Sequence, residues 1–395
     1  MKEWTCVVVG GGYAGIHAVK EIRQTFKEEK TAGHKLRIIL VDQNPYHLRK
    51  VLLFRVAAGN EQITIPLKEM FPQGVEFLQA AVTRIVSAEK RLLYTGAEGE
   101  PASLSYDILI LAAGSIVRGP GPGQGGMVLS DPEAAGSIRE SWRANLKQAA
   151  IVTESVERQR LMTIVVAGAG ISGIETSAEL AFAVREEARQ LGLDPDGLSI
   201  QLINASSRLF PEGPVKVGLK LEQVLGTYGV EVKHERKVVS SQAGTVALDD
   251  GTTIPAGLCI WTLGLQPSPM LGSLGLPLTP GGFICVDASY RVHDAPGVYS
   301  IGDCARIAEP GSGHVDGKTC KEAIGQASRL AKIIWADISG RPAPEHKAYM
   351  TFFCFGLGPG RGMAWTHQWG LDILITGRLG WRLRKFTWDA ASFLK

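Results

Sequence analysis

The feature that most constrains this chain is a glycine-rich signature at its start. In residues 5–15 (TCVVVGGGYAG), three valines lead into a loop that carries Gly10, Gly12 and Gly15 in G-x-G-x-x-G spacing. The first glycine allows a tight turn, the second lets the backbone approach a pyrophosphate, and the third lets helix and strand pack closely. The pattern predicts a strand, a phosphate-binding loop and a helix in a parallel sheet.

A second apolar run, residues 36–42 (LRIILVD), ends at Asp42. A carboxylate at the end of this strand is suited to bind both hydroxyls of an adenosine ribose. The alternative is a glycine turn in a sheet that binds no nucleotide, which leaves Asp42 as a helix cap by coincidence. The two features together favour a dinucleotide site.

The signature recurs in TIVVAGAGISGIETSAELA, where Gly168, Gly170 and Gly173 repeat the spacing. Two copies indicate an internal duplication with two nucleotide sites. A bound flavin dinucleotide and a diffusible NAD(P)H explain the need for two sites, because hydride transfer requires that their rings meet. The sequence therefore predicts an oxidoreductase.

The strand after the second loop ends at Asn204, where many dinucleotide sites carry a carboxylate. A carboxylate would repel a 2′-phosphate, whereas Asn204 and Arg208 would accept one. This favours NADPH over NADH. The alternative is that Arg208 only caps or pairs on the surface.

Three further stretches lie where a cofactor would be contacted. Residues 44–59 contain Lys50 and follow an Asn-Pro break, which suits a segment lying over a cofactor or a plain amphipathic connector. The buried run 105–115 ends in the small residues Ala113 and Gly114. In residues 297–305 a short strand delivers Gly302 and Asp303, where a carboxylate can bind ribityl hydroxyls.

The composition limits the partners and the cellular compartment that the chain can have. A net charge of +3 over 395 residues does not indicate a nucleic-acid partner. The six cysteines form no C-x-x-C pair, which indicates a reducing, cytoplasmic compartment. We expect no signal peptide, no spanning helix and no metal requirement.

The chain resembles the two-dinucleotide-binding-domain flavoproteins, and specifically the type II NADH dehydrogenases and the ferroptosis-suppressor (apoptosis-inducing-factor-homologous) oxidoreductases. The strings that carry the resemblance are VVVGGGYAGIHA, VDQNPYHLRKVLLFRVAAG, YDILILAAGS, VVAGAGISGIETSAELA, IWTLGLQPSP and VYSIGDCA. It implies FAD in the first domain, NAD(P)H in the second and a quinone as electron acceptor.

The resemblance also implies roles for individual residues. It assigns FAD to Gly10, Gly12, Gly15, Asp42, Val82 and Asp303, and NAD(P)H to Gly168, Gly170, Gly173 and Gly264. The further cofactor-binding candidates, from the stretches described above, are Lys50, Ala113, Gly114, Gly302, Asn204 and Arg208. Glu175 matches a family carboxylate close to the nicotinamide and flavin. Lys318 or Lys321, with the helix N-terminus beside them, is expected to stabilise negative charge on the reduced flavin.

Two departures from the family bear on the acceptor. Cys320, Lys321 and Gly325 stand where type II dehydrogenases carry an A-Q-x-x-x-Q pattern, so both glutamines are absent. The ferroptosis-suppressor branch also lacks them and has a lysine matching Lys318. The C-x4-C pair of the disulfide reductases is absent near the first helix, which excludes a dithiol relay.

We therefore predict an α/β protein of two Rossmann-like domains with a C-terminal region. The expected boundaries are 1–118 with 277–345 for the FAD domain, 119–160 for a linker and helix, 161–276 for the NAD(P)H domain and 346–395 for a membrane-facing or dimerisation region. The expected activity is transfer of electrons from NAD(P)H through FAD to a quinone-like acceptor. The alternatives are a soluble reductase for a small electron-carrier protein or a quinone-like metabolite, and a flavin- and nucleotide-binding sensor.

The last stretch, residues 377–395, has helical periodicity. An apolar stripe is expected from Leu379, Leu383, Phe386, Ala390 and Phe393, with basic residues on another face. Such a helix suits the cytoplasmic surface of a membrane, which it is too short and too charged to span. The alternative is packing on the protein itself or across a homodimer.

Overall fold

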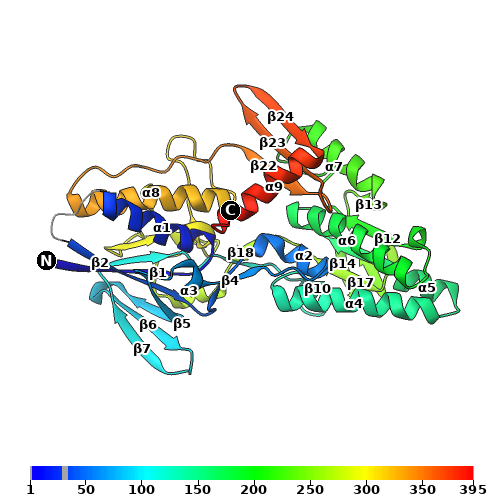
Figure 1. The fold of residues 1–395 in the computed structure, drawn as a ribbon, viewed down its shortest axis with the longest axis horizontal. Coiled ribbons are helices and arrows are strands. Elements are labelled where there is room, and N and C mark those ends of the chain that lie inside the picture. Colours follow the sequence, from blue (N-terminus) through cyan, green and yellow to red (C-terminus); the bar gives the residue numbers. More distant parts are fainter. Residues whose placement is uncertain (1, 29–33, 395) are drawn as a thin grey trace.

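The computed structural model describes residues 2–28 and 34–394. Two α/β units lie side by side, and a C-terminal hairpin and helix lie over the region where they meet (Figure 1). This arrangement confirms the predicted class of two Rossmann-like units with a C-terminal region.

The first unit is built on a seven-stranded sheet in the order β20-β8-β1-β2-β5-β6-β7. Its parallel strands are β1 (Lys2–Val9), β2 (His34–Asp42), β5 (Glu76–Val86), β8 (Ile108–Leu111) and β20 (Val298–Ser300). The antiparallel strands β6 (Arg91–Gly96) and β7 (Pro101–Ser105) complete it. Because β20 follows the second unit in the sequence, the chain returns to this sheet after leaving it.

Helices α1 (Tyr13–Glu28) and α8 (Cys320–Ser339) cover one face of this sheet (Figure 1). Their apolar faces share a core with the sheet, in which Ile16, Leu330 and Ile334 have no exposed surface. A capping box starts α8, with the Thr319 hydroxyl and the Glu322 carboxylate bonding each other's backbone N–H. The short elements of this unit are β19 (Ile284–Cys285), β21 (Ala305–Arg306), η2 (Ser87–Glu89), η4 (Pro269–Ser273) and η5 (Gly302–Cys304).

The second unit has a parallel sheet in the order β10-β17-β11-β12-β13. Its strands are β10 (Met127–Val128), β11 (Thr163–Ala167), β12 (Ser199–Ile203), β13 (Val230–Lys233) and β17 (Leu258–Trp261). Its helices are α4 (Pro132–Ile151), α5 (Ser155–Leu161), α6 (Ile171–Gln190), α7 (Val215–Thr227) and η3 (Pro195–Gly197). A smaller sheet packs on one face of this parallel sheet and shares a core with it. Its three strands are β14 (Val238–Gln242), β15 (Thr245–Leu248) and β16 (Thr253–Pro255).

Two features join the units. Strands β9 (Ser115–Val117) and β18 (Leu265–Pro267) pair antiparallel where the chain enters and leaves the second unit. The hairpin β3 (Tyr46–Leu48) and β4 (Thr64–Pro66) carries η1 (Lys50–Leu52) and α2 (Leu53–Ala58), and α3 (Leu67–Met70) follows. Helix α2 packs against α4 and α6, so a segment of the first unit is built into the core of the second.

The C-terminal region is an antiparallel sheet of β22 (Phe352–Gly356), β23 (Gly362–Gln368) and β24 (Leu371–Thr376), followed by α9 (Gly377–Ala391). This confirms the predicted helix, although Lys395 lies outside the described residues. The expected stripe is divided: Leu379 and Phe386 are exposed, whereas Phe393 lies beyond the helix and packs edge-on against His17. The helix instead buries Gly380, Arg384, Trp388 and Ala391.

The two glycine loops have the same geometry. Gly10 and Gly168 have φ of +110° and +111°, which favours glycine. A Cβ on the third glycine would lie 1.8 Å from the Gly10 carbonyl oxygen in the first loop and 1.9 Å from that of Gly168 in the second. A Cβ on either middle glycine, Gly12 or Gly170, would meet nothing within 4 Å. The outer glycines thus serve packing, and the middle ones face open space.

This geometry predicts different outcomes for two alanine variants of the first loop. Gly15→Ala should destabilise the flavin-free chain by about 1–3 kcal/mol, since the methyl group collides with backbone. Gly12→Ala should leave the thermal unfolding temperature of that chain nearly unchanged. Equal unfolding temperatures for both variants, measured by calorimetry, would contradict this division of roles.

Candidate functional site

A cavity of about 710 Å³ lies between the two units and the C-terminal region. This volume falls within the range of roughly 300–1,000 Å³ typical of ligand pockets. The first glycine loop lines it from one side, and Ile171, Ser172 and Glu175 at the start of α6 line it from the other. The first loop and the start of the helix that follows the second loop therefore face one space.

Most of the predicted site residues lie in the lining of this cavity. They are Gly10, Gly12, Asp42, Lys50, Val82, Ala113, Gly114, Glu175, Gly264, Gly302, Asp303, Lys318 and Lys321. The others are Gly15, Gly168, Gly170, Gly173, Asn204 and Arg208, which lie outside the lining. Gly15, Gly168 and Gly173 make the backbone packing contacts that shape the loops.

Asp42 stands at the end of β2, beside the first loop. One carboxylate oxygen accepts from the Gly11 N–H at 2.6 Å and the other from the Asn44 N–H at 2.7 Å. Burial raises the pKa of Asp42, and these backbone hydrogen bonds oppose the rise. The carboxylate is thus fixed at the point where an adenosine ribose would meet the loop.

A second polar cluster forms around Asp303. The Ser115 hydroxyl donates to the Asp303 carboxylate at 2.7 Å, and the Lys50 ammonium donates to the Ser115 carbonyl at 2.9 Å. Burial raises the pKa of Asp303, while Ser115 and Lys50 oppose the rise. Burial lowers the pKa of Lys50, and Asp303 opposes this. The cluster places a carboxylate and a cation on one stretch of cavity wall.

Lys318 and Lys321 bring two more cations to the start of α8. The Lys318 ammonium lies 4.1 Å from the Phe283 ring centroid, and that of Lys321 lies 4.9 Å from the Phe352 ring centroid. Burial lowers the pKa of both lysines. Two partly desolvated cations and the N-terminal end of a 20-residue helix make this wall electropositive.

Glu175 is paired with a residue that the sequence analysis missed, Arg384 of α9. The Arg384 guanidinium donates to both Glu175 oxygens, at 2.8 and 2.9 Å, and the Gly356 N–H adds a bond of 2.6 Å. Burial raises the pKa of Glu175, and the guanidinium opposes the rise most strongly. Glu175 and Arg384 are only 2% and 9% exposed, so the pair is largely desolvated. An arginine within a surface-type helix pattern gave no sequence signal for this contact.

Asn204 and Arg208 brace their own loop. The Asn204 amide donates to the carbonyls of Ser206 and Arg208. The Arg208 guanidinium donates to the carbonyls of Phe210, Pro211 and Gly213 at 2.7–3.0 Å. These contacts give no geometric support to a phosphate-binding role for Arg208.

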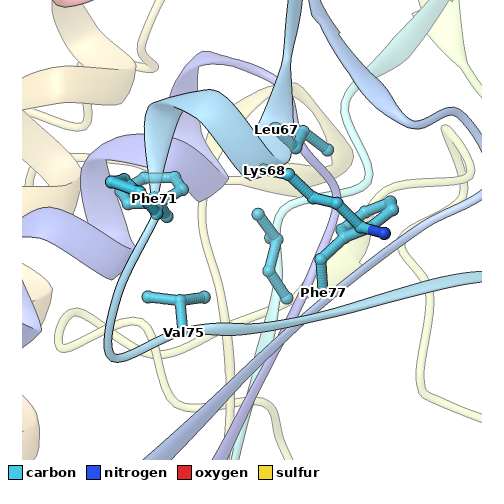
Figure 2. A pocket seen from close by; sticks show the side chains of 7 residues that line it. Leu67, Lys68, Phe71, Val75 and Phe77 are labelled. Carbon is cyan, nitrogen blue, oxygen red and sulfur yellow. The ribbon is translucent and has the colours of Figure 1, made fainter.

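A smaller cavity of about 260 Å³ lies beneath α3, and its lining residue Leu67 lies next to Gly11 of the first loop. Figure 2 shows Leu67, Phe71, Val75 and Phe77 around it, with the Lys68 side chain beside them. It shares no lining residue with the main cavity and adds no acid, base or nucleophile to it.

Residues 2–28 and 34–394 contain no cluster of three His, Cys, Asp or Glu side chains suited to a metal ion. Their helices also fall short of the length and apolarity needed to cross a bilayer.

Residues 4–327 match the family described as pyridine nucleotide-disulphide oxidoreductase. A demethylphylloquinone reductase of a Synechocystis strain is 27% identical over 345 residues, covering 85% of this chain and 80% of the relative. A type II NADH:quinone oxidoreductase of Staphylococcus aureus is 24% identical over 347 residues, covering 86% and 84%. The structure of NDH2 from Plasmodium falciparum in complex with NADH has a TM-score of 0.81 at 16% identity, covering 97% and 94%, which shows a shared fold.

The buried pair makes a stability prediction. Arg384→Leu should destabilise the chain by about 3–5 kcal/mol near pH 8, because the Glu175 charge loses its partner. This loss of stability should become smaller as the pH falls toward 4.5, the ordinary pKa of Glu. A carboxyl whose pKa is raised in the folded state favours folding only when it is protonated. Thermal unfolding from pH 5 to 8 measures both effects.

The matched control is Arg382→Leu, an exposed position on the same helix, which should unfold within a degree or two of the parent. Adding Glu175→Leu to Arg384→Leu should recover most of the lost stability. A double variant no more stable than Arg384→Leu would argue against an energetically coupled pair.

Proposed function

The chain belongs to the pyridine nucleotide-disulphide oxidoreductase family, and on this basis we propose that it is an FAD-dependent NAD(P)H oxidoreductase that passes two electrons to a quinone-like acceptor. The observation that carries the proposal is a single cavity lined by the first glycine loop and by Ile171, Ser172 and Glu175 at the start of α6, beside the second loop. Two dinucleotides seated on these loops would meet there. The relatives named as a demethylphylloquinone reductase and an NADH:quinone oxidoreductase support the choice of acceptor.

The residues present fit FAD in the first unit. The open space above Gly12 leaves room for a pyrophosphate to approach the backbone, and the α1 N-terminus faces it. Asp42 is positioned for the adenosine ribose and Asp303 for the ribityl hydroxyls. When bound, FAD supplies the redox chemistry by accepting a hydride from NAD(P)H and delivering electrons onward.

The chain's own residues stabilise charge and orient the reactants. Lys318 and Lys321 bring positive charge to one wall of the cavity, where it would stabilise negative charge on a reduced flavin bound beside them. Their contacts with aromatic rings hold the two ammonium groups in place without neutralising them. Because this wall is partly desolvated, each cation acts more strongly than it would in water.

Glu175 and Arg384 define the side of the cavity nearest the second loop. Three hydrogen bonds fix the Glu175 carboxylate, so it presents a rigid surface against which a nicotinamide ring would be oriented. Gly264, which directly precedes strand β18, lines the same cavity with its backbone. These groups position the donor ring and need not exchange a proton.

In the proposed reaction, no pair of cysteine thiols relays electrons between the flavin and the acceptor. The chain has no C-x4-C pair near its first helix, and all six cysteines are free thiols. An external acceptor must therefore reach the cavity. We assign it to the quinone class, and we leave the dinucleotide as NAD(P)H, since Asn204 offers no carboxylate to repel a 2′-phosphate.

The acceptor is proposed to arrive from a membrane surface. The C-terminal region exposes large apolar side chains beside basic ones: Trp369 is 89% exposed, Leu371 65%, Leu379 57% and Phe386 69%. They lie on the β23–β24 hairpin and on α9, with Arg378, Arg382 and Lys385 exposed on that helix. This combination suits peripheral contact with the cytoplasmic face of a membrane.

The activity test is a titration of the flavin-loaded chain. Addition of NADH or NADPH should bleach the flavin absorbance rapidly. A soluble quinone added afterwards should restore this absorbance. Slow or absent bleaching would favour the sensor alternative. Reoxidation by small electron-carrier proteins but by no quinone would favour the soluble-reductase alternative.

The membrane proposal is tested by co-sedimentation with anionic liposomes. The double variant Phe386→Ser with Leu379→Ser should bind the liposomes less than the parent at low salt. High salt should weaken binding of the parent, because each basic residue near the anionic surface contributes about 1 kcal/mol of electrostatic attraction. The matched control is Ile151→Ser, an apolar residue 80% exposed at the end of α4. Equal sedimentation of both variants with the parent would contradict the assignment.

A further inference from the structure

Gly11, in the middle of the first glycine loop, is held through both of its backbone polar groups. Its N–H donates to Asp42, as described above, and its carbonyl accepts from His47 Nδ1 at 2.9 Å. His47 follows β2 on the β3 strand and has no exposed surface. The Gly11 carbonyl shares a planar peptide unit with the Gly12 N–H, so fixing this carbonyl fixes the direction in which the Gly12 N–H would meet a bound pyrophosphate.

The second nitrogen of His47 links the loop to the C-terminus. A carbonyl only accepts, so Nδ1 carries a proton, and burial lowers the pKa of His47 to about 4, which keeps the ring neutral. His47 Nε2 is therefore an acceptor. The Ser392 hydroxyl, 3.2 Å away in a residue only 1% exposed, donates to it.

Other contacts dock the same C-terminal turn on the first unit. The Arg49 guanidinium pairs with Asp389 at 2.6 Å, with side chains 9% and 14% exposed. His17 Nε2 donates to the Ala391 carbonyl at 2.9 Å. Phe393, in the left-handed region at φ +60°, packs edge-on against the His17 ring at 4.6 Å. A non-glycine residue holds that conformation only when its surroundings fix it.

We propose that Ser392, in this turn of residues 389–394, is part of the FAD site and controls flavin retention by holding the Gly11 carbonyl through His47. The inference rests on the proposed assignment of the first loop to FAD. The turn continues directly from α9, whose outer face carries exposed Leu379 and Phe386. Displacement of α9 would therefore reach the pyrophosphate loop through two hydrogen bonds.

The experiment measures FAD affinity of the full-length chain by reconstitution of the flavin-free protein, followed by flavin fluorescence. Ser392→Ala should weaken FAD binding about tenfold, the effect of one hydrogen bond of ordinary strength. Leu394→Ala, in the same turn but 42% exposed, is the matched control and should stay within twofold of the parent.

A double-variant cycle separates this link from general loosening of the turn. His47→Asn keeps an amide donor for the Gly11 carbonyl but cannot reach Ser392. Adding Ser392→Ala to His47→Asn should change FAD affinity by less than twofold, because the link is already cut. Thermal unfolding of the flavin-free variants shows that each has folded.

The outcomes distinguish the two levels of the argument. FAD affinity unchanged by Ser392→Ala, or full additivity of the two substitutions, would overturn the role of the turn while leaving the proposed function intact. A parent chain that binds no FAD would overturn the proposed function and this inference with it.

Discussion

The contact between Arg384 and Glu175 is the point at which the separate parts of this molecule meet. Glu175 belongs to the helix after the second glycine loop, Arg384 to the last helix, and the Gly356 N–H to the C-terminal sheet. All are largely buried, so each depends on the others for compensation of its lost hydration. A cavity wall is thereby assembled from residues up to 209 positions apart.

The two units are otherwise joined by elements that do not belong wholly to either. Helix α2, from the first unit, packs in the core of the second, and Phe54 lies 5.9 Å from the Trp388 ring of α9. The paired strands β9 and β18 carry the chain across in both directions. Because these contacts surround the cavity, small relative movements of the units would change its shape first.

The sequence predicted what depends on local chemistry. Both strand-loop-helix units are where the glycine spacing indicates, because the positive φ of Gly10 and the close approach of Gly15 to the Gly10 carbonyl arise within the loop itself. Long-range pairs were not predictable in this way. Arg384 and His47 find partners 209 and 345 positions away, and nothing in their immediate neighbours marks them. Arg208 shows the converse: its local setting suggested a ligand, whereas loop carbonyls occupy its guanidinium.

Helix α9 buries Trp388 and Ala391 as an ordinary surface helix would, but it departs from that pattern at three other positions. It turns Arg384 inward, where an ion pair compensates the charge, and leaves Leu379 and Phe386 in solvent. Burying those apolar side chains in place of a charge would gain roughly 1.5–3 kcal/mol each, so the observed orientation is not the one that hydrophobic burial alone would select. The orientation is explained if the inner face serves the cavity and the outer face serves a second surface. The inner face of α9 contributes Arg384 and Thr387 to the cavity lining, while its outer face carries the exposed Leu379 and Phe386.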